Sequence, residues 1–226
     1  MGRYPARGAE APGSGRKGNM KRITSIVFDF GNVITLPQDK GPVAAMAAAL
    51  GGSTVEALEA AYAEGRGAYD RGDIGPAEYW AGVGERLGVR VDGALLSELK
   101  RLDVESWFNM NGEMLAFIDS LRPRVRRLGL LSNINEEGVR QLRKDGGWLD
   151  CFDARILSCE HRLLKPEPGI FELCLRELGE EASSCLFVDD LPENVEGARA
   201  VGMRGHVFKG LAGLKAELED AYELVR

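Results

Sequence analysis

The stretch "IVFDFGNVIT", from Ile26 to Thr35, decides our interpretation of the fold. Its apolar start leads directly into a carboxylate, Asp29, and a glycine stands two residues later at Gly31. An apolar run without strict alternation is typical of a strand whose two faces are both covered by other elements. The stretch therefore predicts a buried strand that ends in a carboxylate.

Four more apolar runs share this character. With the first strand, the five runs cover residues 23–30, 126–133, 154–159, 184–190 and 204–208. Helical patterns separate them from the second run onward, at residues 135–147, 168–180 and 192–203. This alternation predicts an α/β fold, a three-layer, Rossmann-like open parallel sheet with helices on both faces.

The interval between the first two runs is far longer than one crossover connection needs. It contains five helical patterns, at residues 41–52, 53–72, 75–88, 93–107 and 111–122. Ser53 and Glu56 match a capping box at the start of the second pattern. We expect the last of these helices to pack on the sheet.

These patterns predict two structural units and a leader. Residues 37–110 form an all-helical insert, and residues 20–36 and 111–226 form the α/β core. Residues 1–19 are rich in Gly, Pro and Arg and lack a periodic apolar pattern, which is typical of a disordered segment.

Composition excludes several classes of protein. The net charge is −6, and the first 22 residues carry six basic side chains but one acidic one, so the rest of the chain is acidic. That balance argues against a nucleic-acid partner. No apolar stretch approaches the ~18 residues that a membrane helix needs, and no secretory pattern is present. The four cysteines lack C-x-x-C spacing, which argues against zinc and favours reduced thiols in a cytoplasmic protein. Both a monomer and a homodimer fit the sequence.

Polar side chains gather where the predicted strands end. They are Asp29 after the first strand, Ser132 and Asn133 after the second, Lys165 in the loop after the third, and Asp189 and Asp190 after the fourth. Ligands of an open parallel sheet bind at this edge. Each residue alone fits a helix cap or a solvated loop. Three carboxylates together, however, need a cation to offset their repulsion. Mg²⁺ binds carboxylates and completes its shell with water and phosphate oxygens.

Four motifs then point to one family. They are "VFDFGNV" at residues 27–33, "LLSN" at 130–133, "LLKPEPGIF" at 163–171 and "FVDDLPENVEGARAVGM" at 187–203. In this order the set resembles the haloacid dehalogenase-like (HAD) hydrolase superfamily, and the insert resembles its helical cap. "YDRGDIGPAEYW" at 69–80 and the D-x-G-N-V pattern resemble the glucose-1-phosphate phosphatase-like subgroup.

The resemblance implies a Mg²⁺-dependent hydrolase of small phosphate monoesters, with sugar phosphates among the candidate substrates. Asp29 is then the nucleophile that forms an aspartyl phosphate. Lys165 is catalytic and binds phosphate together with Ser132 and Asn133, and Asn194 is a supporting partner. The implied metal ligands are Asp29, the Gly31 carbonyl, Asp189 and, close by, Asp190. The implied partner is a small phosphorylated metabolite.

Gly31 departs from the family pattern. Most phosphatases of the superfamily have a second aspartate there as general acid and base, a role that contributes about 10²–10⁴ in rate. Asp70, Asp73 and Glu78 are candidates to replace it, and the sequence selects none of them. Two alternatives stay open: a metal-independent 2-haloacid dehalogenase-type hydrolase, and a non-catalytic protein that binds phosphate esters. The acidic pair in "VDDLPEN" argues against the dehalogenase.

Overall fold

A five-stranded parallel sheet forms the centre of the molecule. The computed structural model describes residues 22–144 and 146–220, so the predicted leader at 1–19 lies outside the described residues. The strands are β1 (Ser25–Phe28), β2 (Arg127–Ser132), β3 (Ala154–Leu157), β4 (Cys185–Asp189) and β5 (Arg204–Val207). Their order is β3-β2-β1-β4-β5, and every neighbouring pair is parallel. The predicted α/β class is confirmed, and β1 lies in the middle of the sheet.

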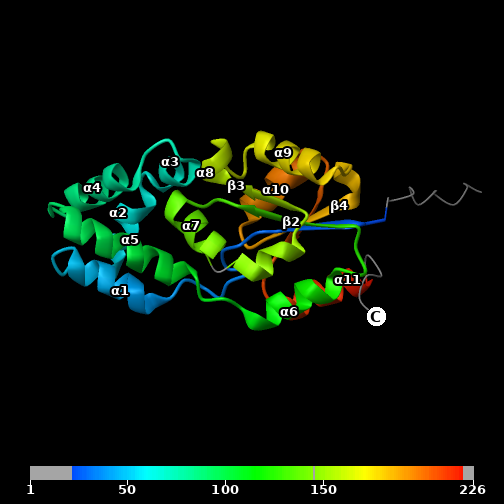
Figure 1. Cartoon of the computed structure of the whole chain (residues 1–226), viewed down its shortest axis with the longest axis horizontal. Helices are drawn as coiled ribbons and strands as arrows, with labels where there is room; N and C mark the ends of the chain where they lie inside the picture. The colour runs from blue at the N-terminus through cyan, green and yellow to red at the C-terminus, as the bar shows by residue number, and fades with distance from the viewer. Residues whose placement is uncertain (1–21, 145, 221–226) are drawn as a thin grey trace, which may run out of the picture.

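Helices cover both faces of this sheet (Figure 1). One face packs against α6 (Gly112–Leu121), α7 (Glu136–Lys144) and α11 (Leu211–Asp220), and the other against α9 (Pro168–Leu178) and α10 (Pro192–Ala200). Within β1, Ile26 and Phe28 belong to the first hydrophobic cluster and Val27 to the second. All three are fully buried, which explains why the strand sequence is continuously apolar. Shorter helices complete the core: η1 (Gly146–Cys151), α8 (Ser158–His161) and η2 (Ala182–Ser184).

The first five helices gather beyond one end of the sheet (Figure 1). They are α1 (Lys40–Ala49), α2 (Val55–Ala63), α3 (Arg66–Arg71), α4 (Pro76–Arg86) and α5 (Gly93–Trp107). They enclose a third hydrophobic cluster, in which Tyr69, Tyr79 and Trp80 are buried. A cluster of this kind is what a separate insert needs, and the division at residues 37–110 stays a prediction.

The second predicted helix differs from the structure in two ways. It is interrupted by Gly65, whose φ of +80° lies in the left-handed region that favours glycine. The predicted capping box is wrong, because Thr54 is the N-cap and its side chain accepts from the Ala57 amide at 3.2 Å. The Ser53 hydroxyl donates instead to the Ala47 carbonyl at 3.2 Å. The predicted third strand also ends early, since α8 begins at Ser158.

The segments that lead into and out of these helices run side by side. Thr35 and Met110 form an isolated antiparallel bridge. The Leu36 amide donates to the Asn109 carbonyl at 2.7 Å, and the Asn111 amide donates to the Ile34 carbonyl at 3.0 Å. The chain therefore enters and leaves these helices through one short two-stranded connection.

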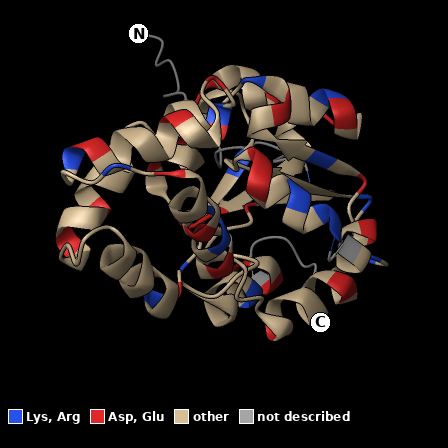
Figure 2. Cartoon of the chain, turned by 60° about the vertical axis from the view of Figure 1, so that its left-hand side comes forward, with Lys and Arg blue, Asp and Glu red and all other residues tan. Residues whose placement is uncertain are grey.

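Charged residues of both signs are mixed along the helices (Figure 2). Many of them form surface ion pairs, such as Arg101 with Glu105 on α5 and Arg140 with Glu136 on α7. Among the described residues, no helix is both long enough and apolar enough to cross a bilayer. Many surface charges are therefore balanced by a neighbouring charge of opposite sign.

Candidate active site

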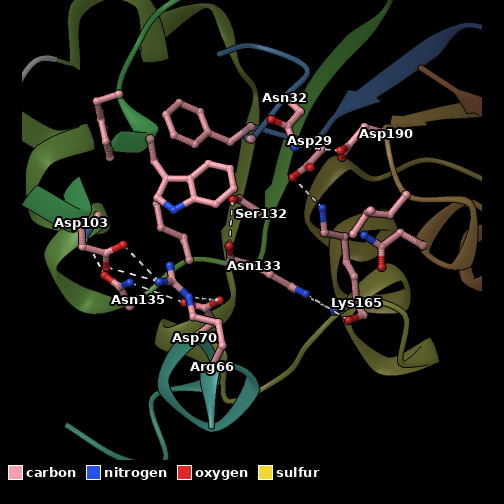
Figure 3. Close-up of a pocket in the computed structure, with 18 of the residues that line it drawn as sticks. Asp29, Asn32, Arg66, Asp70, Asp103, Ser132, Asn133, Asn135, Lys165 and Asp190 are labelled. Carbon is pink, nitrogen blue, oxygen red and sulfur yellow. Dashed lines mark hydrogen bonds and ion pairs between the residues drawn. The ribbon is translucent and has the colours of Figure 1, made fainter. Parts of the chain in front are cut away.

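A buried ammonium group joins two of the strand ends. Asp29 follows β1 directly, Asp189 ends β4, and Lys165 lies in the loop between α8 and α9. The Lys165 Nζ is 2.6 Å from Asp29 Oδ1 and 2.7 Å from Asp189 Oδ2. The Asp29 amide also donates to the Val188 carbonyl at 2.9 Å, which fixes the first carboxylate beside the end of β4. The pairing of β1 with β4 thus brings together residues that are far apart in the sequence, and Figure 3 shows the Asp29 carboxylate beside the Lys165 ammonium.

Burial and charge act in opposite directions on these groups. Burial raises the pKa of Asp29 to about 7; the charge of Lys165 lowers it and that of Asp189 raises it. For Lys165, burial lowers the pKa, but the charges of Asp29 and Asp189 outweigh this effect and raise it. The lysine therefore stays charged, and the nucleophile candidate would gain from further positive charge nearby.

The site has the donor set of a hard divalent cation. Asp29, Asp189 and Asp190 each offer a carboxylate oxygen, and these atoms lie within 4.8 Å of one another. The Asn32 amide donates to Asp190 Oδ2 at 2.8 Å and orients that carboxylate. Oxygen ligands at this spacing fit Mg²⁺, so the predicted residues are compatible with the predicted ion.

Asp189 is held by the chain on both oxygens. Its Oδ1 accepts from the Leu191 amide at 2.8 Å, and Asn194 Nδ2 lies 3.1 Å from each oxygen. Its Oδ2 also accepts from Lys165. The predicted supporting contact of Asn194 is therefore present, and Asp189 is positioned to orient the lysine.

Asn133 braces the loop that carries Lys165. Its Nδ2 donates to the Lys165 carbonyl at 3.0 Å, and its Oδ1 accepts from the Lys165 amide at 2.9 Å. Ser132, one residue earlier, is buried and lines a cavity that lies between the strand ends and the helices of the insert. The end of β2 thus supplies a hydroxyl and a clamp on the neighbouring loop.

An indole covers the position where the second acid is missing. A Cβ at Gly31 would lie 3.5 Å from a ring carbon of Trp107. That distance is an ordinary van der Waals contact, so the indole packs directly against position 31. The Trp107 Nε1 donates to the Tyr62 hydroxyl at 3.1 Å, so the ring is held in place by the helical insert.

A cavity of about 360 Å³ connects these groups to the helices of the insert. Its insert-side wall includes Tyr62, Arg66, Asp70, Asp103 and Trp107. This volume lies in the range of small-molecule sites, about 300–1,000 Å³. The strand ends and the insert therefore face one ligand-sized space (Figure 3).

Comparison with known proteins agrees with this geometry. The model of the haloacid dehalogenase-like hydrolase family matches residues 23–202. The chain belongs to this family. Its family membership accounts for the parallel sheet and for the convergence of the four motifs at one edge.

One curated relative of this HAD-like hydrolase is named as a phosphatase. Sesquiterpene phosphatase astK from Aspergillus oryzae is 28% identical over 145 residues, 64% of this chain and 72% of the relative. The chain spans about half or less of several other curated relatives.

Two solved structures show the same fold. A HAD family enzyme from Bacteroides thetaiotaomicron, in complex with magnesium and inorganic phosphate, gives a TM-score of 0.70 at 22% identity, covering 85% of this chain and 98% of that one. The L-2-haloacid dehalogenase from Xanthobacter autotrophicus gives 0.62 at 21% identity, covering 90% and 85%.

The sequence of this HAD-like hydrolase did not reveal the insert side of its site. Of the three predicted replacements for the acid, Asp70 lines the cavity, whereas Asp73 and Glu78 are exposed and do not line it. Arg66 and Asp103 were missed, since helical periodicity alone does not say which polar residue faces a distant strand. Asn32, the asparagine of the D-x-G-N-V pattern, is a sequence signal for the contact with Asp190 that the structure shows at 2.8 Å.

Proposed function

We propose that this hydrolase cleaves small phosphate monoesters, sugar phosphates among them, through an aspartyl phosphate on Asp29. The observation that carries the proposal is the buried contact of the Lys165 Nζ with both Asp29 and Asp189. A carboxyl group beside a buried ammonium at the end of a ligand-sized cavity supports the role of a nucleophile for Asp29. The phosphatase name of one relative and the magnesium and phosphate bound to one structure of the same fold support it.

The reaction would proceed in two displacements. An Asp29 oxygen forms a bond to phosphorus while the ester P–O bond breaks, and the alcohol oxygen leaves with the electron pair. A water oxygen then bonds to phosphorus while the P–O bond to Asp29 breaks, which releases inorganic phosphate and restores the Asp29 carboxylate. The proton that water loses to solvent balances the proton that the alkoxide takes from it. Such transfers depend mainly on positioning and on neutralising the phosphoryl oxygens. Lys165 would supply charge for those oxygens, and Ser132 a hydroxyl donor.

The metal site would be built from the same strand ends. Asp29, the Gly31 carbonyl and Asp189, with Asp190 close by, would hold Mg²⁺, which would supply positive charge to the carboxylates and the phosphoryl oxygens. The contacts of Asp189 suggest a second task, the orientation of Lys165. Asn133 would fix the position of the loop that carries Lys165 through its two hydrogen bonds to the Lys165 backbone.

No carboxyl group at position 31 would protonate the leaving group. On the insert side, Asp70 is paired with Arg66 at 2.9 Å, but burial, the largest effect, raises the pKa of Asp70 despite the charge of Arg66. Alcohols of low pKa need less protonation, so an anomeric sugar oxygen fits this site better than a simple alkoxide.

Replacement of the nucleophile tests the proposal. We expect p-nitrophenyl phosphate hydrolysis with Mg²⁺ to fall to background in Asp29→Asn and Asp29→Ala, and to fall in wild type with a chelator. Asp119→Asn, an exposed aspartate on α6, is the matched control and should keep wild-type turnover. Unchanged rates in both Asp29 variants would refute this nucleophile.

The dehalogenase alternative has one observation in its favour, the absence of a carboxyl group at Gly31 on a fold that haloacid dehalogenases share. The clustering of Asp29, Asp189 and Asp190 argues against it. Chloride release from 2-chloropropionate in the presence of chelator would establish it. Binding of phosphate esters without turnover of any of them would instead favour a non-catalytic protein.

We also propose a cytoplasmic location, because all four cysteines are free among the described residues. The partner would be a small phosphorylated metabolite. A monomer and a homodimer both remain compatible with the proposal.

A further inference from the structure

The insert-side wall of the cavity contains a buried cluster of three charges. Arg66 lies between two carboxylates, with its Nε 2.9 Å from Asp70 Oδ2 and its Nη1 3.2 Å from Asp103 Oδ1. The Tyr62 hydroxyl donates to Asp103. The Asp103 side chain is 3% exposed and the Arg66 side chain 19% exposed. Figure 3 shows the cluster across the cavity from Asp29 and Lys165.

The cluster has one positive and two negative groups, so its formal charge is negative when all three are ionised. Burial lowers the pKa of Arg66, but the charges of Asp103 and Asp70 outweigh this and raise it well above its usual value. Arg66 therefore stays protonated, and the two neighbouring carboxylates balance its positive charge. Its Nε and Nη1 already donate to Asp70, to Asp103 and to the Tyr62 hydroxyl.

The two aspartates of the cluster keep capacity to accept hydrogen bonds. Asp70 Oδ1 receives one long contact, 3.5 Å from Asn135 Nδ2, and carboxylate oxygens each accept more than one hydrogen bond. A hydroxyl or an ammonium group on a ligand would find acceptors here. A carboxylate or second phosphate would meet negative charge in a partly desolvated space, where repulsion is stronger than in water.

The wall beside the cluster is apolar. The Trp107 nitrogen is used by Tyr62, so the indole offers ring carbon to the cavity near Gly31. Phe30 and Phe108, with ring centroids 5.1 Å apart, also line the cavity. The organic part of a ligand would therefore meet aromatic carbon as well as carboxylate oxygens.

We infer that Asp70 and Asp103 are specificity-determining residues that select phosphate esters whose organic part is neutral and hydroxylated or cationic, and that they reject esters with a second anionic group. This inference rests on the proposed phosphatase function, because it assigns the phosphoryl group to the Asp29 end of the cavity. The insert-side cluster then faces the leaving group.

Matched esters test the selection. We would measure phosphate release with Mg²⁺ from glucose 6-phosphate, glucosamine 6-phosphate and 6-phosphogluconate, which share six carbons and differ in charge. Each would also be tested as a competitive inhibitor of p-nitrophenyl phosphate hydrolysis. We expect kcat/KM, or the inverse inhibition constant, to be at least about tenfold lower for 6-phosphogluconate than for the other two.

Variants assign the effect to the cluster. Asp103→Asn and Asp70→Asn each remove one negative charge and should reduce the discrimination against 6-phosphogluconate at least about threefold. Glu105→Gln, on the same helix as Asp103 but exposed and paired with Arg101, removes the same charge outside the cavity and should leave it unchanged. Circular dichroism would check folding, and either aspartate variant alone suffices for the comparison.

The outcomes separate the two proposals. Equal or faster turnover of 6-phosphogluconate by wild type, or equal loss of discrimination in Glu105→Gln, would overturn the selection and leave the phosphatase intact. No phosphate release from any ester, p-nitrophenyl phosphate included, would overturn both.

Discussion

Replacement of Lys165 by methionine tests whether the site is held together by charge. The substitution keeps most of the side-chain length and removes the ammonium that lies 2.6 Å from Asp29 and 2.7 Å from Asp189. At an effective dielectric constant of about 20, each contact corresponds to a Coulomb attraction of about 6 kcal/mol before desolvation is subtracted. Measured losses on breaking buried pairs are smaller, about 3–5 kcal/mol. We expect a loss of that size in the free energy of unfolding of Lys165→Met at neutral pH without metal.

The loss should depend on pH in a defined direction. Burial already raises the pKa of Asp29 to about 7, and removal of Lys165 should raise that pKa further. A carboxyl group whose pKa is raised by folding stabilises the protein below its unfolded pKa of about 3.9 and loses that contribution as pH rises. The deficit of Lys165→Met should therefore be smaller at pH 5 than at pH 7.5.

Urea denaturation provides the assay. The free energy of unfolding would be measured at both pH values, with chelator and with millimolar Mg²⁺. Mg²⁺ should recover more stability in Lys165→Met than in wild type, because a bound cation would replace the missing charge. Lys209→Met, at an exposed lysine, is the control and should change stability by less than about 0.5 kcal/mol. A deficit below about 1 kcal/mol with chelator at pH 7.5, smaller than a typical buried-pair loss, would refute the reasoning.

Three further predictions concern the leaving group, the lysine loop and the sheet. Without an acid at Gly31, rates should fall steeply as leaving-group pKa rises, by at least about tenfold from p-nitrophenyl to phenyl phosphate; a flat dependence would indicate an efficient proton donor. Asn133→Ala removes both hydrogen bonds to Lys165, and kcat/KM for p-nitrophenyl phosphate should fall about 10–100-fold, whereas wild-type kinetics would show that the brace is dispensable. Hydrogen bonds from Arg122 lower the pKa of Asp153 to about 2. Because this ion pair is exposed and screened by solvent, Asp153→Asn should lose about 1 kcal/mol of unfolding free energy at pH 7, less than the full shift implies. Urea titrations should show that difference shrinking from pH 4 to pH 2, and a constant difference would contradict it.

The strand ends were predictable because parallel strands share an edge. Asp29, Lys165 and Asp189 each follow an apolar run, and the rule that ligands bind beyond the carboxyl ends brings them together without knowledge of strand order. The order itself, with β1 in the middle, was not encoded in any local pattern.

The insert side was not predictable in the same way. The choice of Asp70 over Asp73 and Glu78 depends on how α3 and α4 are oriented toward the sheet, and that orientation results from packing of the third hydrophobic cluster. The break at Gly65 also changed the direction of the chain within a single helical pattern. The packing of the third hydrophobic cluster and the turn at Gly65 together determine which face of α3 lines the cavity, and helical periodicity alone does not.

The bridge between Thr35 and Met110 makes the intervening helical segment simple to replace by engineering. Residues at the two ends of the intervening helices already lie at the separation of paired strands, roughly 5 Å between Cα atoms. Joining them directly would close only a tight turn, and substituting a longer segment would add little entropic cost, since loop closure grows slowly with length. A different helical segment inserted at this junction should therefore leave the ends of the strands in place, although it would replace the insert-side wall of the cavity.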